Sequence, residues 1–270
     1  MLIKRAASAA AIIIFGLALA LAGGWIFSLG LALILATAAW EYANMFKKGG
    51  YAPASALLVT ATFVCTALNW FNDIELFLAV FSAFSLLIIA HHIFSFSKTQ
   101  SSGGIDLAAS LSGLVFIAFL GSYLVRLRFL PDGLFWVIIA VAPAGISDIG
   151  AYFFGSAFGH HKLAPNLSPG KSLEGYLGGV FTAVVTGYAS ALIAGLFNPG
   201  FSGQEGLLVG SIVGLVCPMG DLGKSLMKRQ FNLKNTSNLI PGHGGVLDRV
   251  DTWLWAGPIS FYLISYFLLK

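Results

Sequence analysis

The sequence predicts an all-α, polytopic integral membrane protein, built as a bundle of about nine transmembrane helices. Hydrophobic residues make up 57% of the 270 residues and charged residues only 10%, and the mean hydropathy is +0.86. Apolar runs of about 20 residues, each long enough to cross ~30 Å of hydrocarbon, recur along the chain. This composition excludes a soluble globular domain.

Nine candidate spans follow one another along the chain: 8–23, 25–45, 52–71, 75–96, 106–125, 133–157, 174–197, 206–223 and 252–269. Only Gly23 and Gly24 separate the first two spans, so a tight helical hairpin is required there. The first span, with Lys4 and Arg5 ahead of it, also resembles a signal peptide. We favour a retained helix because no polar mature domain follows.

The basic residues orient the bundle. With a cytoplasmic N-terminus and nine crossings, 12 of the 15 basic residues lie inside and 3 outside, as the positive-inside rule requires. The inner group is Lys4, Arg5, Lys47, Lys48, Lys98, Lys162, Lys171, Lys224, Lys228, Arg229, Lys234 and Arg249; the outer group is Arg126, Arg128 and Lys270. The basic loops also attract anionic lipid. The sequence has no basic stripe with interleaved aromatic residues, so the positive charge is no argument for nucleic-acid binding.

We treat residues 1–270 as a single integral membrane domain with two functional parts. Residues 1–131 are mainly scaffold helices, whereas residues 132–270 hold nearly all the unusual polar residues and are expected to carry the active site. Cys65 and Cys217 both lie in apolar spans and belong to no CxxC spacing, so we interpret them as packing residues.

Polar residues at 147–175 form a first constellation. Asp148 lies within the sixth span, where a buried aspartate is functional more often than structural; the alternative is a hydrogen bond to Ser147 or Tyr152. Ser168 and Lys171 follow in a proline-containing loop. Ser172 is a candidate N-cap, and Lys171 beside that helix start suits a phosphate. An ordinary capped loop with a solvated lysine explains the spacing equally well.

A second constellation lies at 221–229. Asp221, Lys224, Ser225, Lys228 and Arg229 fall at i, i+3, i+4, i+7 and i+8, which places them along one helix face. An aspartate can hold Mg²⁺ while the cations neutralise the phosphates that the ion bridges. The alternative is an amphipathic helix whose cations meet lipid head groups, which leaves the aspartate unexplained.

The segment PGHGGVLDRVD, residues 241–251, completes the polar region. Its glycines, Gly244 and Gly245 among them, predict a tight turn whose backbone N–H groups approach a ligand closely, with His243 inside it. Asp248 and Asp251 are three residues apart and share a helix face. Asp251 could instead start the last helix, with Arg249 as its ion-pair partner.

These motifs resemble the phosphatidate cytidylyltransferase (CDP-diacylglycerol synthase) family. The C-terminal match consists of Ser225, Lys228, Arg229, Lys234, Pro241 through Gly245, Asp248, Arg249 and Asp251. The residues from Ser147 to Gly175 are similar to two further family patterns, and Trp40–Glu41 also suits the family. Asn235 departs from the pattern, because the family usually has Asp there.

The resemblance implies an enzyme of phospholipid biosynthesis that converts CTP and phosphatidic acid into CDP-diacylglycerol and pyrophosphate. It also implies a Mg²⁺-dependent site, sometimes with a second, monovalent cation such as K⁺, and metal ligation by Asp221 and Asp248. From chemistry we add Asp148 and Asp251 around the metal. Phosphate binding is assigned to Lys171, Lys228 and Arg229, and nucleotide contacts to His243, Gly244 and Gly245. Ser168, Ser225 and Arg249 complete the expected substrate site.

We expect a bacterial inner membrane protein with its active site facing the cytoplasm, and keep a homodimer open. Three other functions remain. A transferase moving a sugar phosphate onto a polyprenyl phosphate would use similar residues. A transporter would spread polar residues through several spans to both surfaces, whereas here they cluster on one side. A catalytically silent relative is suggested by Asn235 alone.

Overall fold

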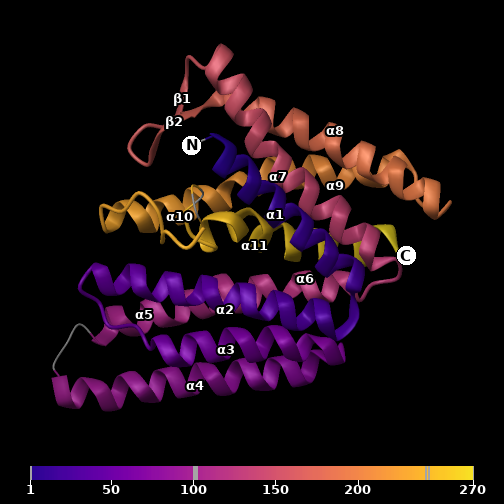
Figure 1. The fold of residues 1–270 in the computed structure, drawn as a ribbon. Coiled ribbons are helices and arrows are strands. Elements are labelled where there is room, and N and C mark those ends of the chain that lie inside the picture. Colours follow the sequence, from indigo (N-terminus) through magenta and orange to yellow (C-terminus); the bar gives the residue numbers. More distant parts are fainter. Residues whose placement is uncertain (1, 100–102, 241, 243, 270) are drawn as a thin grey trace. The chain divides into compact units, whose positions relative to one another are not determined.

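The computed structural model describes residues 2–99, 103–240, 242 and 244–269, and it confirms the predicted helical membrane fold (Figure 1). Among the described residues, six helices are long and apolar enough to cross a membrane: Gly24–Lys48, Ile74–Phe96, Gly103–Arg128, Gly133–Phe158, Leu173–Phe197 and Gly203–Gln230. The first and third expected spans coincide with shorter apolar helices, Ala10–Ala22 and Ser55–Phe71. The total of nine crossings and the cytoplasmic N-terminus stay predictions.

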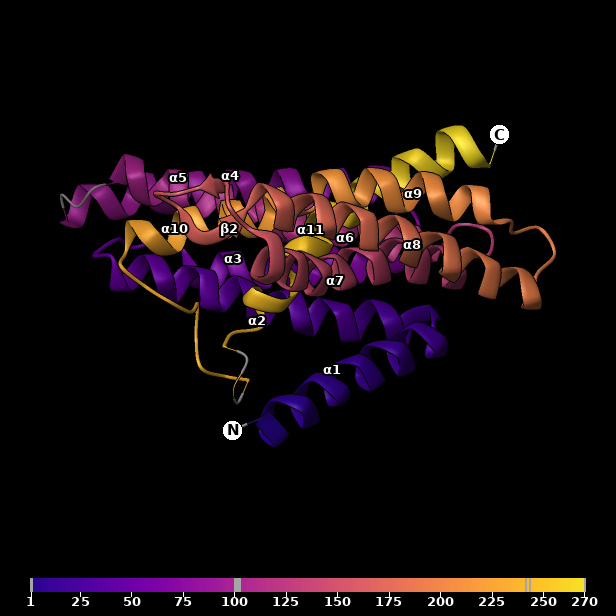
Figure 2. The same cartoon turned by 90° about the horizontal axis from the view of Figure 1, so that it is seen from above.

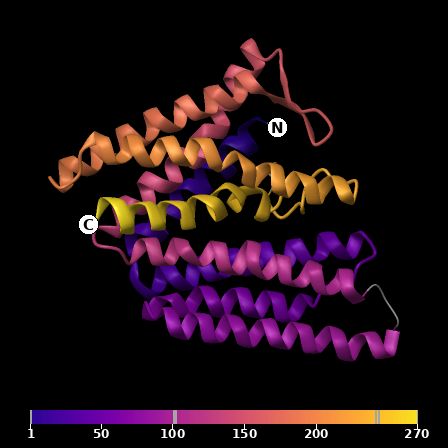
Figure 3. The ribbon, with the colours of Figure 1, turned by 180° about the vertical axis from the view of Figure 1, so that it is seen from behind.

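The chain divides into two compact units, residues 1–126 with 228–250 and residues 127–227 with 251–270. The first unit holds these helices: α1 (Leu2–Ala22), α2 (Gly24–Lys48), α3 (Ser55–Leu68), the 3₁₀ turn η1 (Asn69–Phe71), α4 (Ile74–Thr99), α5 (Gly103–Gly113), the π-helical η2 (Leu114–Phe119) and most of α6 (Leu120–Arg128). Within it α2, α3, α4 and α5 lie side by side in Figures 1 and 3.

The expected hairpin between the first two spans is confirmed. Helix α1 ends at Ala22 and α2 begins at Gly24. Gly23 and Gly24 have φ values of 60° and 52°, in the left-handed region that glycine enters at little cost. Figure 2 shows α1 and α2 diverging from this turn.

Tyr42 of α2 makes polar contacts with two residues of α5. The hydroxyl of Tyr42 donates to the Ala109 carbonyl over 2.9 Å and lies 2.7 Å from the Ser112 hydroxyl. Tyr42 is fully buried, and a Cβ added at Gly113 would overlap its ring. Helix α2 is therefore held at a defined rotation, which matters because it also carries Glu41.

The second unit holds α7 (Gly133–Phe158), β1 (Lys162–Ala164), β2 (Ser168–Ser172), α8 (Leu173–Phe197), α9 (Gly203–Val216), most of α10 (Pro218–Gln230), and α11 (Leu247–Leu263) from Asp251 onward with the π-helical η3 (Ile264–Leu268). Helices α7, α8 and α9 pack closely through small residues, as in other membrane bundles. A Cβ added at Gly187 of α8 would overlap the Gly206 carbonyl of α9.

A short antiparallel ribbon interrupts the helices where the sequence analysis expected only a loop. Strand β1 pairs with β2 through Lys162–Ser172 and Ala164–Ser168. Ser172 then caps α8 as expected, because its Oγ accepts a hydrogen bond from Gly175 N at 3.1 Å. Glu174, in the first turn of α8, accepts bonds from the backbone N–H groups of His160 and His161. The ribbon thus delivers Lys171 at a fixed position beside a helix start.

Candidate active site

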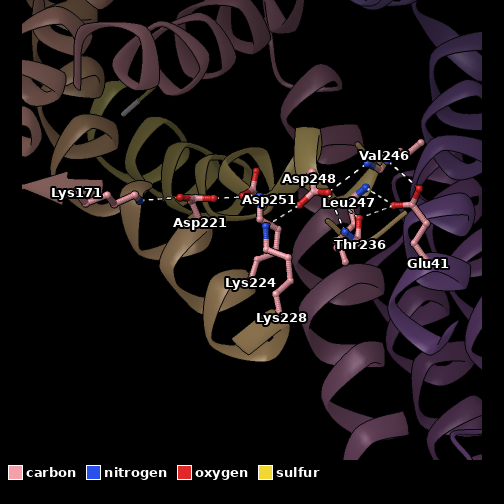
Figure 4. Close-up of polar contacts among 11 residues, drawn as sticks. Glu41, Lys171, Asp221, Lys224, Lys228, Thr236, Val246, Leu247, Asp248 and Asp251 are labelled. Carbon is pink, nitrogen blue, oxygen red and sulfur yellow. Dashed lines mark hydrogen bonds and ion pairs between the residues drawn. The ribbon is translucent and has the colours of Figure 1, made fainter. Parts of the chain in front are cut away.

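Two lysines and two aspartates form an ion-paired group in the second unit, which we call the α10 cluster (Figure 4). Lys171 of β2 reaches Asp221 of α10, with Nζ 2.7 Å from Oδ2. Lys224, one turn further along α10, lies 3.0 Å from Asp221 Oδ1 and also pairs with Asp251 of α11. Lys224 and Asp251 are each only 3% exposed.

The pairing explains how this cluster tolerates burial. An isolated ion costs several kcal/mol to remove from water, whereas a pair with good geometry recovers much of that cost. Two ammonium groups and two carboxylates cancel in formal charge. Removing Lys224 would leave Asp251 buried without the cation that faces it.

A second group in the first unit, which we call the loop cluster, consists of Asp248 with Lys228, Thr236 and Glu41 (Figure 4), and of Ser237, which is hydrogen-bonded to Glu41. Asp248 Oδ1 lies 3.0 Å from Lys228 Nζ. Its Oδ2 accepts hydrogen bonds from Thr236 N at 3.0 Å and from Gly245 N at 3.2 Å. The bond to Gly245, three residues earlier, is the reach-back typical of an acid in the first turn of a helix. Asp248 therefore fixes the loop that precedes α11.

Glu41 of α2 holds the same loop. Its Oε1 accepts from Ser237 Oγ at 2.5 Å and from Val246 N at 2.9 Å, and its Oε2 accepts from Leu247 N at 2.8 Å. The side chain is 0% exposed. A carboxylate is favoured here because the first N–H groups of α11 lack partners within the helix.

Thr236 connects the two acids of the loop cluster. Its hydroxyl lies 3.2 Å from Glu41 Oε2 and 3.0 Å from Asp248 Oδ2, so the two carboxylates share its single proton. Gly245 lies against the same atoms, and a Cβ there would overlap both Thr236 Oγ1 and Glu41 Oε2. The loop therefore requires glycine at this position for steric reasons.

The expected glycine turn is present. Gly242 and Gly244 have φ values of 79° and 84°, and Ile240 N donates to the Gly244 carbonyl over 2.8 Å. Gly244 and Gly245 are buried. His243, which the sequence analysis assigned to nucleotide binding, lies outside the described residues, as does Pro241.

The remaining expected site residues occupy less enclosed positions. Asp148 lies on α7 and is exposed on the surface of the chain, rather than buried inside it as the sequence analysis assumed. Ser168 begins β2, and Ser225 is half-buried on α10. Arg229 and Arg249 are both exposed, near the end of α10 and the start of α11.

Sequence reasoning missed the central roles of Lys224, Glu41, Thr236 and Ser237. Lys224 was placed on the correct helix face but was left out of the site, although its i+3 spacing from Asp221 already indicated an ion pair. Glu41 carried a usable signal, because a lone acid within an apolar span is costly without a partner. Thr236 and Ser237 carried none, since their partner lies about 200 positions earlier in the sequence.

The acids present suit a magnesium ion in chemistry, since Mg²⁺ prefers carboxylate oxygens. Among the described residues, however, no three His, Cys, Asp or Glu side chains are grouped so that they could hold a metal. Asp221, Asp248 and Asp251 each face a lysine ammonium. A metal bound at any of them would compete with that lysine.

The fold and these clusters define a polytopic membrane protein with charge-paired lysines and aspartates, a set suited to polyanionic substrates. The chain matches the cytidylyltransferase family over residues 3–267 and belongs to that family. It is 31% identical to a phosphatidate cytidylyltransferase of Synechocystis sp., with 97% of this chain and 96% of that protein covered.

Two further relatives cover less of the chain. A phosphatidate cytidylyltransferase of Bacillus subtilis is 34% identical over 72% of this chain and 68% of its own length. The uncharacterized protein YnbB of Escherichia coli is 34% identical over 73% of this chain and 66% of its own length.

Proposed function

We propose that this chain is a phosphatidate cytidylyltransferase: it transfers the cytidylyl group of CTP to phosphatidate, giving CDP-diacylglycerol and pyrophosphate. The observation that carries the proposal is the match to the Synechocystis enzyme over nearly the whole length of both chains. The membrane fold supports it, because one substrate is a lipid.

The reaction is a displacement at phosphorus. A phosphate oxygen of phosphatidate forms a bond to the α-phosphorus of CTP, and the bond from that phosphorus to the pyrophosphate oxygen breaks. The nucleophile is already an anion, so no covalent enzyme intermediate is needed. The main barrier is the approach of two polyanions, which makes positioning and charge neutralisation the chief tasks of the protein.

The lysines supply the positive charge. Asp221 holds Lys171, and Asp248 holds Lys228, each in one position. A phosphate oxygen that replaces the aspartate as the lysine's partner meets an ammonium group already in place, with little side-chain entropy left to lose. Arg229 adds exposed positive charge on the same helix as Lys228.

Mg²⁺ is part of the proposal, with Asp221, Asp248 and Asp251 as candidate ligands that would each give up a lysine partner, and K⁺ as an accompanying monovalent cation. When bound, Mg²⁺ would neutralise phosphate charge and stabilise the leaving group. Whether Asp221 and Asp248 share one ion stays a prediction. We further propose an inner-membrane location, an active site on the cytoplasmic side and a homodimer.

The test is conversion of radiolabelled CTP and phosphatidate to a labelled lipid by the purified protein. We expect CDP-diacylglycerol from the parent in Mg²⁺ and at least a hundredfold less from Asp221→Asn or Asp248→Asn, the loss typical of a key electrostatic group. Asp73→Asn is the matched control, because exposed Asp73 caps α4 and asparagine caps equally well.

Two results would count against the proposal. Near-parental turnover by both aspartate variants would refute the metal assignment. Label transfer only when a polyprenyl phosphate and a nucleotide sugar replace phosphatidate and CTP would assign the protein to the sugar-phosphate transferases instead. Mg²⁺ binding is checked separately by the melting temperature, which should rise in the parent and less in Asp221→Asn.

A further inference from the structure

A cavity of about 390 Å³ opens beside the last turns of α2, within the first unit. Its lining comes from α2 and from two residues of the loop before α11: Trp40, Glu41, Asn44, Lys47, Lys48, Thr236 and Ser237. Trp40, Asn44, Lys47 and Lys48 belong neither to the α10 cluster nor to the loop cluster.

The charge of the cavity is positive. Lys47 and Lys48 are exposed in the last turn of α2, so their ammonium groups can meet a ligand. Glu41 offsets only part of this charge, because one carboxylate lines the cavity beside two ammonium groups, and its oxygens already accept bonds from Ser237, Val246 and Leu247. Ser237 in turn accepts a bond from Leu239 N, so it has little left to offer. The side-chain donors left for a ligand are therefore the two lysines, the Asn44 amide and the Trp40 indole N–H.

The position of the cavity along α2 indicates how deep its ligand lies. Helix α2 is one of the six candidate spans, and its terminal lysines belong at the height of the lipid head groups. Trp40 is seven residues earlier, roughly 10 Å deeper along the helix axis, and is 46% exposed. Exposed tryptophans are typical of the membrane interface, where the surroundings change from polar head groups to apolar chains. A ligand that lies between Lys47 and Trp40 therefore meets a polar environment at one end and an apolar one at the other.

We propose that this cavity binds the phosphate head of a lipid phosphate monoester, with Lys47 and Lys48 on the phosphate and Asn44 donating to it. Trp40 packs against the glycerol and the first atoms of the acyl chains. The inference rests on the proposed function and extends it, since the lipid is then the phosphatidate substrate. Inorganic phosphate shares the phosphate chemistry but offers nothing apolar to Trp40. CTP offers a base that stacks on an indole ring, so the CTP probe in the binding experiment decides between the lipid and the nucleotide.

The position of the cavity also links it to the loop cluster. Thr236 and Ser237 line the cavity and are hydrogen-bonded to Glu41, and Thr236 also donates to Asp248. A lipid head held by Lys47 and Lys48 therefore lies against the segment that positions Asp248 and Gly245. This places the substrate beside the signature residues of the family without using them as its anchor.

The experiment measures binding to purified protein in a neutral detergent, so that no turnover is needed. The probes are a short-chain phosphatidate, a short-chain phosphatidylcholine, CTP and inorganic phosphate. For the double variant Lys47→Gln/Lys48→Gln we expect the Kd for phosphatidate to rise roughly tenfold or more, as expected for two head-group cations. The Kd for CTP should stay within twofold.

Two further variants sharpen the result. Trp40→Ala should weaken phosphatidate binding and leave competition by inorganic phosphate unchanged. Lys162→Gln, which removes an exposed lysine of β1, is the matched charge control and should bind like the parent. Melting temperatures should agree among all four proteins, since the substituted side chains are exposed.

Three outcomes would overturn the inference: an unchanged Kd for phosphatidate in the double variant, an equal loss of CTP affinity, or inorganic phosphate competing as strongly as the lipid. Failure of the proposed function gives a different pattern. If the parent binds phosphatidate through Lys47 and Lys48 but forms no CDP-diacylglycerol, the proposed function is refuted and the lipid subsite stands. If the double variant forms CDP-diacylglycerol with an unchanged KM for phosphatidate, the proposed function stands and the lipid subsite is refuted.

Discussion

Glu41→Gln is the most informative single substitution in this protein. It changes one oxygen to an NH₂ group and keeps the size of the side chain. The parent carboxylate is fully buried and accepts bonds from Ser237 Oγ, Val246 N and Leu247 N, with a share of the Thr236 hydroxyl. A glutamine has one acceptor oxygen in place of the two carboxylate oxygens. The donors that faced the replaced oxygen would therefore face an NH₂ group, which is itself a donor.

The magnitude follows from the number of bonds lost. Each carboxylate oxygen serves one backbone N–H and one hydroxyl. Leaving a buried donor unsatisfied costs about 1–3 kcal/mol, so two such donors cost roughly 2–6 kcal/mol. The hydroxyls can rotate toward other acceptors, whereas the backbone N–H groups cannot. We therefore expect the loss to fall mainly on Val246 or Leu247.

Hydrogen exchange measured by mass spectrometry reports this directly. For a peptide covering the start of α11, protection should fall by roughly one and a half to four orders of magnitude, since about 1.4 kcal/mol corresponds to a tenfold change. The same assay on peptides of α7 and α8 should be unchanged. Turnover should fall with the loss of protection, because the loop carries Asp248 and Gly245 into position.

Glu75→Gln is the matched control, because Glu75 is exposed in the first turn of α4. This substitution also removes one negative charge near a helix start, but it leaves no buried donor unsatisfied. Hydrogen exchange at the start of α11 should therefore equal that of the parent. If Glu41→Gln also exchanged like the parent at the start of α11, the carboxylate would not be what holds the loop. The hydrogen-bond reasoning would then be refuted, whatever happened to activity.

Two other substitutions test the clusters. Gly245→Ala should lower turnover strongly and reduce hydrogen-exchange protection at the start of α11, because the new methyl group overlaps Thr236 Oγ1 and Glu41 Oε2. A fully active alanine variant would show that the loop accommodates the methyl group at no cost. Lys224→Met should cost about 3–5 kcal/mol of stability by leaving Asp251 without its cation, and Mg²⁺ should restore part of the loss. A Lys224→Met melting temperature equal to that of the parent would contradict the ion-pair argument.

Much of the fold follows from patterns that are local in sequence. Long apolar runs predict helices because a chain in lipid must satisfy its backbone internally. The turn at Gly23 and Gly24 and the cap at Ser172 also depend on neighbouring residues alone. Each was predicted from the sequence and is confirmed by the structure.

The site was less predictable because its pairings join distant residues. The i, i+3 spacing placed Asp221 and Lys224 on one face of α10, but nothing local shows that Asp251 is the second partner of Lys224. The bonds between Glu41 and the loop before α11 span about 200 residues. The β1–β2 ribbon was missed for a different reason, since proline and glycine around it are typical of a loop.

The two clusters solve one electrostatic problem in different ways. In the α10 cluster, ammonium groups balance the carboxylates of Asp221 and Asp251, so an added anion would have to take a lysine from an aspartate. In the loop cluster, Glu41 is balanced by N–H and O–H donors that no phosphate can use while they hold α11 in place. Acids paired with lysines can therefore exchange partners during a reaction, whereas an acid paired with backbone groups keeps its position. This difference separates Asp221, which pairs with lysines, from Glu41, which pairs with N–H and O–H donors. Asp248 combines the two, because its Oδ1 faces Lys228 and its Oδ2 accepts from backbone N–H groups.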